Sequence, residues 1–256
     1  MKILVALKQV PARDSQFRPA SDGRWIETGG LSYEINEPDA YALETGLRLK
    51  EQHGGEVVVL CAGPEGAASA IREALAKGAD RAIHLVEENL LAHDSLSLAR
   101  LLAAAIQQES PDLVLTGLQS DDIGAGQTGV ILAELLGLPH ATIIMEIEVQ
   151  SGAVRVKREL EDGWFQHVTL PLPALLTIQS GSAKLRYATL MGIKKAKTKE
   201  IKPVSAAALG ISAVPGAILE RLSIPERSKQ TVLLEGSPEQ QAAQLVEKLK
   251  HEARVL

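Results

Sequence analysis

The chain has 256 residues, of which 45% are hydrophobic and 23% charged, with a formal net charge of -5. This length suits a large α/β domain with an appendage, and the acidic balance argues against binding nucleic acid through a basic field. No apolar run reaches the roughly 20 residues that a membrane helix needs, and no signal-peptide pattern opens the chain. We therefore expect a cytoplasmic protein with no direct membrane insertion. The single cysteine, Cys61, excludes internal disulfides and a cysteine-rich metal site.

The first half of the chain alternates short apolar runs with helical patterns. The apolar runs are typical of strands buried on both faces, and they cover residues 2–7, 56–62, 81–86 and 112–117. Helical periodicity covers residues 38–52, 67–77, a segment capped by Asp94, and 127–136. Asn36 followed by Asp39 resembles a capping arrangement for the first helix, and Gly137 ends the fourth. This alternation predicts a doubly wound, mostly parallel sheet of the Rossmann-like, adenine-nucleotide-binding class.

The second half has a different pattern. Alternating segments at 143–149, 153–160, 164–170 and 174–179 predict strands, and Asp162 with Gly163 predicts a hairpin turn. We expect this β-hairpin to extend the sheet. A connector at 203–216 then leads to a helix over 237–254, in which Ser237 and Gln240 form a capping box. This helix is an arm that packs on another chain or a helix that folds back on its own sheet, and composition favours neither.

A glycine-rich segment follows the strand at 112–117. Gly124, Gly126 and Gly129 would let backbone N–H groups approach a phosphate, and Ser120, Gln127 and Thr128 could donate further hydrogen bonds. The segment is neither a Walker A loop nor a GxGxxG dinucleotide turn. The alternative is a turn in which the glycines serve only the backbone geometry.

Two other strand ends should lie beside this loop. Ala6 is near the end of the first strand and Ala62 near the end of the second, and small residues there leave room for a flat ring. The first helix begins nearby, in the segment from Asn36 to Asp39. Together these residues predict a mononucleotide pocket, with adenine between small side chains and phosphate at 126–129.

No catalytic constellation is evident in the sequence. The six histidines are scattered without metal-ligand spacing or a nucleophile partner. Cys61 lies in a predicted strand, where core packing is its expected role. Asp121 and Asp122 could hold a metal, but such a pair more often caps a turn. We therefore expect a protein that is not an enzyme.

A basic segment covers residues 184–199. Lysines and arginines surround an apolar centre that contains Leu190 and Met191. In an acidic protein, this positive patch would steer acidic partners. The competing interpretation is a solvated basic helix that covers the sheet.

Several segments together resemble the β subunit of electron transfer flavoproteins. They are ILVALKQV at 3–10, NEPDAYALE at 36–44, EALAKGADRAIHL at 73–85, the SDD and GQTG parts of the glycine-rich loop, VKRELEDGWFQHVTLPLPALLTIQSG at 156–181, and LRYATL with KKAK after it. The resemblance implies a heterodimer with an α subunit that mainly holds one shared FAD, and AMP in the β subunit. It also implies electron transport in fatty acid beta-oxidation, from acyl-CoA and other flavoprotein dehydrogenases to a quinone oxidoreductase.

The resemblance also implies roles for individual residues. Leu190 matches the leucine that family members insert into a pocket of the dehydrogenase, and Lys194 and Lys195 flank it. Residues 1–200 would then form the nucleotide-binding domain, with a recognition loop at about 183–199, and residues 201–256 an arm on the α subunit. The implied AMP contacts are Ala6, Asn36, Glu37, Pro38, Asp39, Ala62, Gly117, Gln119, Ser120, Asp121, Asp122, Gly124, Gly126, Gln127 and Thr128.

Three alternatives remain. Electron-bifurcating members of the family bind a second FAD where others hold AMP, but their loop ends in a run such as Thr-Ala-Gln-Val-Gly, whereas residues 126–129 look like the AMP type. An adenine-nucleotide hydrolase of the same fold would carry an SGGxDS-like loop after the first strand, unlike residues 8–11. A nucleotide-sensing stress protein would not need the 156–199 signature.

Overall fold

The computed structural model describes residues 1–211, 214–225 and 231–256. The chain divides into two compact units, Met1–Leu222 and Ser223–Leu256, which are considered separately. Among the described residues, no helix combines the length and the hydropathy that crossing a membrane requires.

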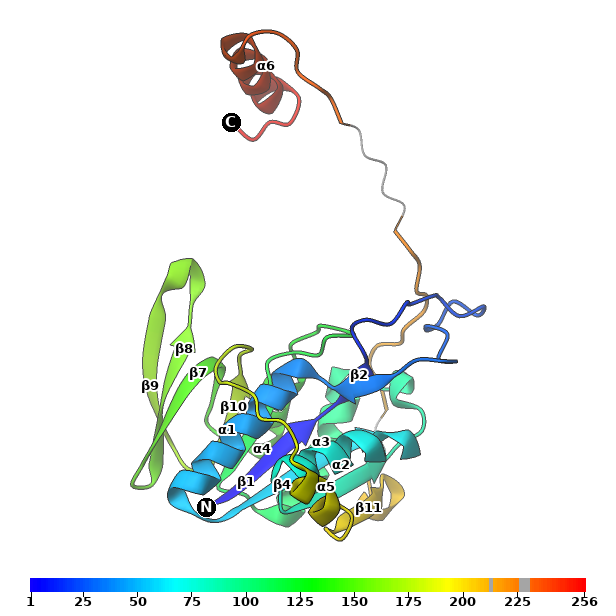
Figure 1. Cartoon of the computed structure of the whole chain (residues 1–256), viewed down its shortest axis with the longest axis vertical. Helices are drawn as coiled ribbons and strands as arrows, with labels where there is room; N and C mark the ends of the chain where they lie inside the picture. The colour runs from blue at the N-terminus through cyan, green and yellow to red at the C-terminus, as the bar shows by residue number, and fades with distance from the viewer. Residues whose placement is uncertain (212–213, 226–230) are drawn as a thin grey trace. The chain divides into compact units, whose positions relative to one another are not determined.

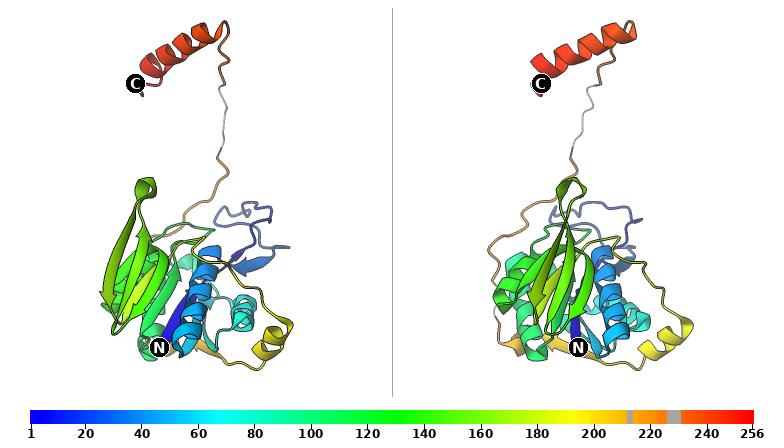
Figure 2. Two further views of the ribbon diagram at one scale, coloured as in Figure 1. Left: turned by 60° about the vertical axis from the view of Figure 1, so that its left-hand side comes forward. Right: turned by 90° about the vertical axis from the view of Figure 1, so that its left-hand side faces the viewer.

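One large sheet organises the first unit. Nine strands of the described chain form it, in the order β11-β5-β4-β1-β6-β10-β7-β8-β9 (Figure 1). Along this order, each neighbouring pair from β11 as far as β7 is parallel. The last two strands, β8 and β9, are added in antiparallel pairing. The bounds are β1 (Lys2–Leu7), β4 (Glu56–Gly63), β5 (Arg81–Val86), β6 (Leu113–Gly117), β7 (His140–Gln150), β8 (Ala153–Glu159), β9 (Phe165–Pro171), β10 (Ala174–Ile178) and β11 (Ile201–Ser205). The doubly wound sheet and its hairpin extension are confirmed, and Figure 2 shows the β8–β9 hairpin reaching past the helices.

Helices cover both faces of this sheet. On one face lie α1 (Glu37–His53) and α2 (Ala68–Lys77), and on the other lie α3 (Ser95–Glu109) and α4 (Thr128–Leu136). The strands supply both cores because successive side chains point to opposite faces. Ile3 and Val5 pack with the first pair of helices, whereas Leu4 between them packs with the second pair, and all three are fully buried. The continuous apolar runs therefore mark strands that are covered on both sides.

The helix ends agree with the sequence patterns except at α1. Asp94 caps α3 by accepting a hydrogen bond from the N–H of Ser97 at 2.8 Å, and Gly137 ends α4 with a φ of 65°. Asn36 occupies the N-cap position of α1, but its side chain makes no capping hydrogen bond. The capping prediction for Asn36 and Asp39 is therefore wrong, because both side chains bind a neighbouring loop and strand ends instead.

Two features of the fold do not follow from the sequence predictions: the place at which the strand predicted at 174–179 inserts into the sheet, and a second, smaller sheet. β10 inserts in parallel between β6 and β7, at the centre of the sheet. In the segment between β1 and α1, two short strands, β2 (Gln9–Pro11) and β3 (Tyr33–Ile35), form a small antiparallel pair. Short helical turns complete the first unit: η1 (Glu65–Ala67), η2 (Leu90–Ala92), η3 (Glu161–Gly163), η4 (Ala207–Leu209) and α5 (Leu190–Ala196).

The predicted boundary at residue 200 falls inside the sheet. Residues 201–205 form β11, which pairs with β5, so the first unit continues to Leu222. The second unit contains α6 (Pro238–His251), which begins with the predicted capping box of Ser237 and Gln240. None of the residues of α6 is buried. That α6 packs on another chain, or folds back on its own sheet, remains a prediction.

Candidate functional site

The strand order places a topological switch point at the carboxyl ends of β1 and β6. β1 pairs with β4 on one side and with β6 on the other, so the chain adds later strands on opposite sides of β1. Open α/β sheets bind ligands at such switch points. Ala6 at the end of β1, Ala62 near the end of β4 and Gly117 at the end of β6 all lie at this edge.

Asp39 joins the ends of the two strands at the switch point. Its Oδ2 accepts a hydrogen bond from the backbone N–H of Lys8 at 2.7 Å, and its Oδ1 accepts one from the N–H of Gly117 at 2.9 Å. The side chain belongs to the first turn of α1 and is 7% exposed. Burial raises the pKa of Asp39 to about 7, against these backbone hydrogen bonds, which favour the charged form.

Asn36 joins the start of α1 to the loop after β6. Its amide nitrogen donates to the carbonyl of Gln119 at 2.9 Å, and its amide oxygen accepts from the N–H of Asp121 at 2.8 Å. The N–H of Glu37 donates to the Asp121 carboxylate at 3.2 Å. The predicted residues 36–39 and 117–122 are therefore one hydrogen-bonded assembly, although about eighty positions of sequence separate them.

Two cations that the site predictions omitted also belong to this assembly. The Nζ of Lys8 lies 2.7 Å from the carboxylate of Asp122, and it also donates to Ser120 at 3.5 Å. The Arg13 guanidinium lies 2.6 Å from Glu37 and 3.1 Å from Asp121. The hydrogen bond to Glu37, followed by that to Asp121, raises the pKa of Arg13. No local pattern could have revealed this pair, because Arg13 and Asp121 are 108 positions apart.

The glycines of the loop have specific steric roles. Gly124 and Gly126 adopt positive φ angles of 67° and 63°, which other residues rarely adopt. Gly129 brings the start of α4 against the sheet, where a Cβ would come within 2.7 Å of Thr177 and 2.8 Å of Thr116. Gln127 is the N-cap residue of α4, and its side chain makes no capping hydrogen bond. It therefore does not engage the first N–H groups of that helix. These features fit a phosphate cradle.

The predicted partner-recognition residues lie apart from this assembly. Leu190 begins α5 and is 82% exposed, and Lys194 and Lys195 are exposed in the same helix. α5 packs against α2 (Figure 2), so the interpretation as a helix that covers the sheet directly does not hold. The exposure of Leu190 also excludes a core role for it.

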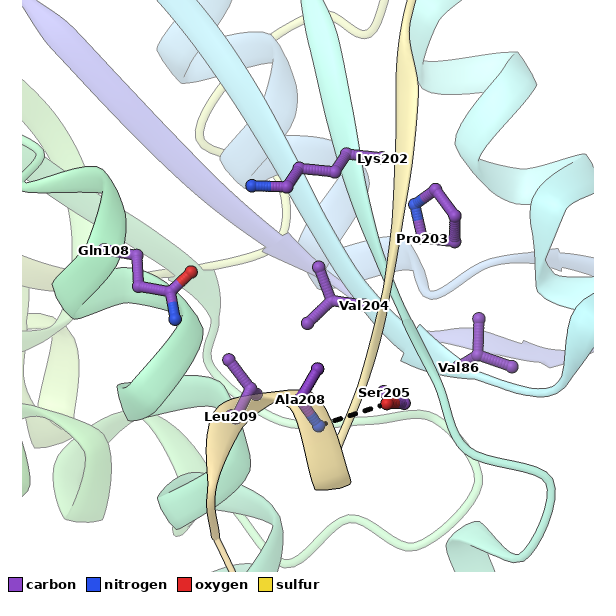
Figure 3. A pocket seen from close by; sticks show the side chains of 8 residues that line it. All are labelled: Val86, Gln108, Lys202, Pro203, Val204, Ser205, Ala208 and Leu209. Atoms are coloured by element: carbon purple, nitrogen blue, oxygen red, sulfur yellow. Dashed lines mark hydrogen bonds between the residues drawn. The ribbon is translucent and has the colours of Figure 1, made fainter.

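A separate cavity lies at the edge strand β11. Its volume is about 480 Å³ (Figure 3). The lining is mainly apolar, with Lys202 as its charged member, and the N–H of Ala208 donates to Ser205 at 3.2 Å. The lining residues are Val86, Gln108, Lys202, Pro203, Val204, Ser205, Ala208 and Leu209. None of them belongs to the predicted nucleotide site.

The predictions about metal ligands and about Cys61 can be compared with the described residues. No group of three or more His, Cys, Asp or Glu side chains in the described ranges could hold a metal ion. Cys61 is fully buried, and burial raises the pKa of its thiol to about 12, so it does not form a thiolate near neutral pH.

Comparisons with known proteins point to one family. The model of the electron transfer flavoprotein domain matches residues 24–209. A relative from Methylophilus methylotrophus, named electron transfer flavoprotein subunit beta, is 38% identical over 96% of this chain and 97% of its own length. Relatives of the same name from Bradyrhizobium diazoefficiens and Bacillus subtilis are 37% and 35% identical, each over the full length of both chains.

Proposed function

The chain belongs to the electron transfer flavoprotein family as a β subunit, and we propose that it binds AMP at the β1/β6 switch point. We also propose that it works in a heterodimer that carries electrons between flavoproteins. Members of this family are electron carriers rather than enzymes. The observation that carries the proposal is the hydrogen-bonded junction of residues 36–39 with residues 117–122 at the switch point.

The AMP proposal assigns a part of the nucleotide to each part of this junction. The adenine would lie between Ala6 and Ala62, where side chains are small. The phosphate would lie at the α4 N-terminus, among the N–H groups that follow Gly126. Bound AMP would supply an adenine ring and a charged phosphate to this site, and it would take no part in redox chemistry. Asn36 and Asp39 would hold the two ends of the proposed AMP site together, through their hydrogen bonds with Asp121 and Lys8.

The shared FAD is proposed to be held mainly by the α subunit. In support, the chain is poor in aromatic residues, at 3%, and several of them are exposed. Trp164 immediately precedes β9 and Phe165 begins it, and these two side chains are 72% and 46% exposed. Exposed aromatic side chains of this kind are common at protein interfaces. We propose that the arm after residue 222 also contacts the α subunit.

The electron donors are proposed to be acyl-CoA and other flavoprotein dehydrogenases, and the acceptor a quinone oxidoreductase, as in fatty acid beta-oxidation. In support, α5 and its flanks expose the apolar side chains of Tyr187, Leu190 and Met191 beside the positive charges of Lys194 and Lys195. An apolar centre with a charged rim is the usual anatomy of a protein-binding site. The cytoplasmic location stays a prediction.

A bifurcating subunit, with a second FAD in place of AMP, is the alternative. Co-expression with a candidate α subunit, followed by acid extraction and chromatography, separates the two. We expect about one AMP and one FAD per heterodimer. Two FAD and no AMP per heterodimer would contradict the proposal. The β subunit purified alone should be colourless and retain AMP, whereas stoichiometric flavin on it would favour the bifurcating type.

A further inference from the structure

The segment from Lys184 to Lys199 presents an apolar surface on a very short helix. Tyr187 is 92% exposed, Leu190 82% and Met191 63%. Helix α5 has seven residues, and isolated helices shorter than about 12 residues are marginal in water. The shape of this surface must therefore be fixed by contacts on its underside.

Arg186 makes the most extensive of these contacts. Its Nε donates to Glu44 at 2.8 Å, and its terminal nitrogens donate to Glu51 at 2.6 and 3.1 Å. The backbone N–H of Arg186 also donates to Glu44, at 3.3 Å. Glu44 and Glu51 both belong to α1, so a single guanidinium bridges two turns of that helix.

Glu44 is placed to receive this cation. The residue is 4% exposed, and an isolated carboxylate so deeply buried would be costly. Burial disfavours its charged form, but the hydrogen bonds from Arg186 and Arg48 outweigh that penalty, and the pKa of Glu44 is lowered. Arg48 also donates to the carbonyl of Lys184 at 2.9 Å. The chain segment that leads into the apolar surface, from Lys184 to Arg186, is therefore held by both side-chain and backbone hydrogen bonds.

The far end of the segment is held against α2. Arg72 donates to the carbonyl of Ala196 at 2.7 Å, and the ammonium of Lys199 donates to the carbonyls of Leu75, at 3.0 Å, and Ala79. Gly192 lies so close to the end of α2 that an added Cβ would collide with the carbonyl oxygen of Ala76. The underside of α5 is therefore fixed at both ends.

We infer that Arg186 is a positioning residue for electron-transfer partners: its bridge to Glu44 and Glu51 holds the apolar surface at 187–193 in the conformation that a partner dehydrogenase contacts. This inference rests on the proposed function of Leu190. A surface that is already ordered spares the partner the entropic cost of ordering it. Arginine suits the task because its planar fork can bind two carboxylates at once, which a lysine ammonium does not reproduce.

The test is a double-mutant cycle on the heterodimer, with an acyl-CoA dehydrogenase and its acyl-CoA substrate as the electron source. Arg186→Gln should lower kcat/KM for heterodimer reduction about tenfold, through KM, with kcat changed less than about twofold. In the Leu190→Ala background the same substitution should add less than about twofold, because both act on one contact. Arg186→Lys should fall between wild type and Arg186→Gln. Arg100→Gln, exposed on α3 across the sheet, is the matched control.

Amide hydrogen exchange gives a readout that does not depend on the dehydrogenase. In Arg186→Gln, exchange in residues 184–193 should accelerate about tenfold or more, while the strands of the sheet stay protected. If Arg186→Gln destabilises the whole chain, Glu51→Gln, which removes the exposed half of the bridge, should show the same local effect more weakly.

The outcomes separate the inference from the proposed function. Unchanged exchange in residues 184–193 of both bridge variants overturns the inference. So does a loss of kcat/KM in Arg186→Gln that is equally large with and without Leu190. If Leu190→Ala itself leaves transfer unchanged, the proposed docking function fails, and faster exchange alone would then support the bridge as an ordering contact.

Discussion

Asp39 and Gly117 are in direct contact at the switch point of the sheet. The N–H of Gly117 donates to Oδ1 of Asp39 at 2.9 Å, and a Cβ added to Gly117 would come within 2.5 Å of that oxygen. The first turn of α1 and the last residue of β6 can therefore meet only because position 117 has no side chain. This contact sets the position of the loop that leads to α4.

Gly117→Ala should damage both stability and nucleotide binding. The added methyl would also come within 2.7 Å of Pro38, so α1 and the loop must separate. We expect a loss of about 1–3 kcal/mol in the free energy of unfolding, as for other overpacked sites, together with loss of co-purified AMP. Urea denaturation and acid extraction measure the two effects. Gly29→Ala is the control, because a Cβ at Gly29 meets no atom within 4 Å.

The raised pKa of Asp39 predicts a pH dependence of the nucleotide-free chain. The folded chain holds a proton on Asp39 up to pH about 7, whereas the unfolded chain releases it near the ordinary value of 3.8. The stabilising contribution is therefore complete below pH 3.8 and is lost as pH rises through 7. Relative to Asp39→Asn, the wild type should lose about 2–3 kcal/mol of unfolding free energy between pH 5 and pH 8. Parallel pH profiles for the two proteins would show that Asp39 does not titrate in this range.

Asp122→Asn should loosen the loop over the nucleotide site. One oxygen of Asp122 pairs with the ammonium of Lys8 at 2.7 Å and also accepts the N–H of Ile123 at 2.7 Å. The amide keeps the shape but loses the charge, so we expect about 1–2 kcal/mol of lost stability and faster release of AMP. Melting curves and nucleotide dissociation rates measure these effects. Asp14→Asn, at an exposed position, should change neither.

Truncation after Leu222 should weaken the heterodimer without unfolding the first unit. The boundary follows the division of the chain into two compact units. α6 keeps Leu245 and Val246 about half exposed, at 48% and 51%, so the described residues of its own unit leave its apolar face largely uncovered. We expect the affinity for the α subunit to fall at least about tenfold, measured by calorimetry. Unchanged affinity would show that the arm does not bind the α subunit.

The sequence predicts the sheet well because its signals are local. Each of the parallel strands β1, β4, β5 and β6 is a continuous apolar run, and the ends of α3 and α4 follow from Asp94 and Gly137. Strand insertion is not local. The run at 174–178 looks like any other strand, and its place between β6 and β7 depends on contacts made far along the chain.

The same distinction applies to the candidate site. The glycine-rich loop and the small residues at strand ends are visible in the sequence, because a parallel sheet brings its carboxyl ends together. The side-chain roles are not visible. Asn36 and Asp39 read as helix caps, but they bind residues about eighty positions away. Lys8 and Arg13 enter the site through ion pairs that span more than one hundred positions.

Stopped-flow reduction of the heterodimer by an acyl-CoA dehydrogenase tests the central claim most directly, when wild type and Leu190→Ala are compared. Leu190 is 82% exposed, so the substitution should leave the melting curve and the AMP and FAD content unchanged. Loss of an interface anchor should slow reduction by about tenfold or more. Charge reversal at Lys194 and Lys195 should instead lower the association rate in a salt-dependent way. Reduction of the Leu190→Ala heterodimer at the wild-type rate, or no reduction of the wild type, would contradict the account.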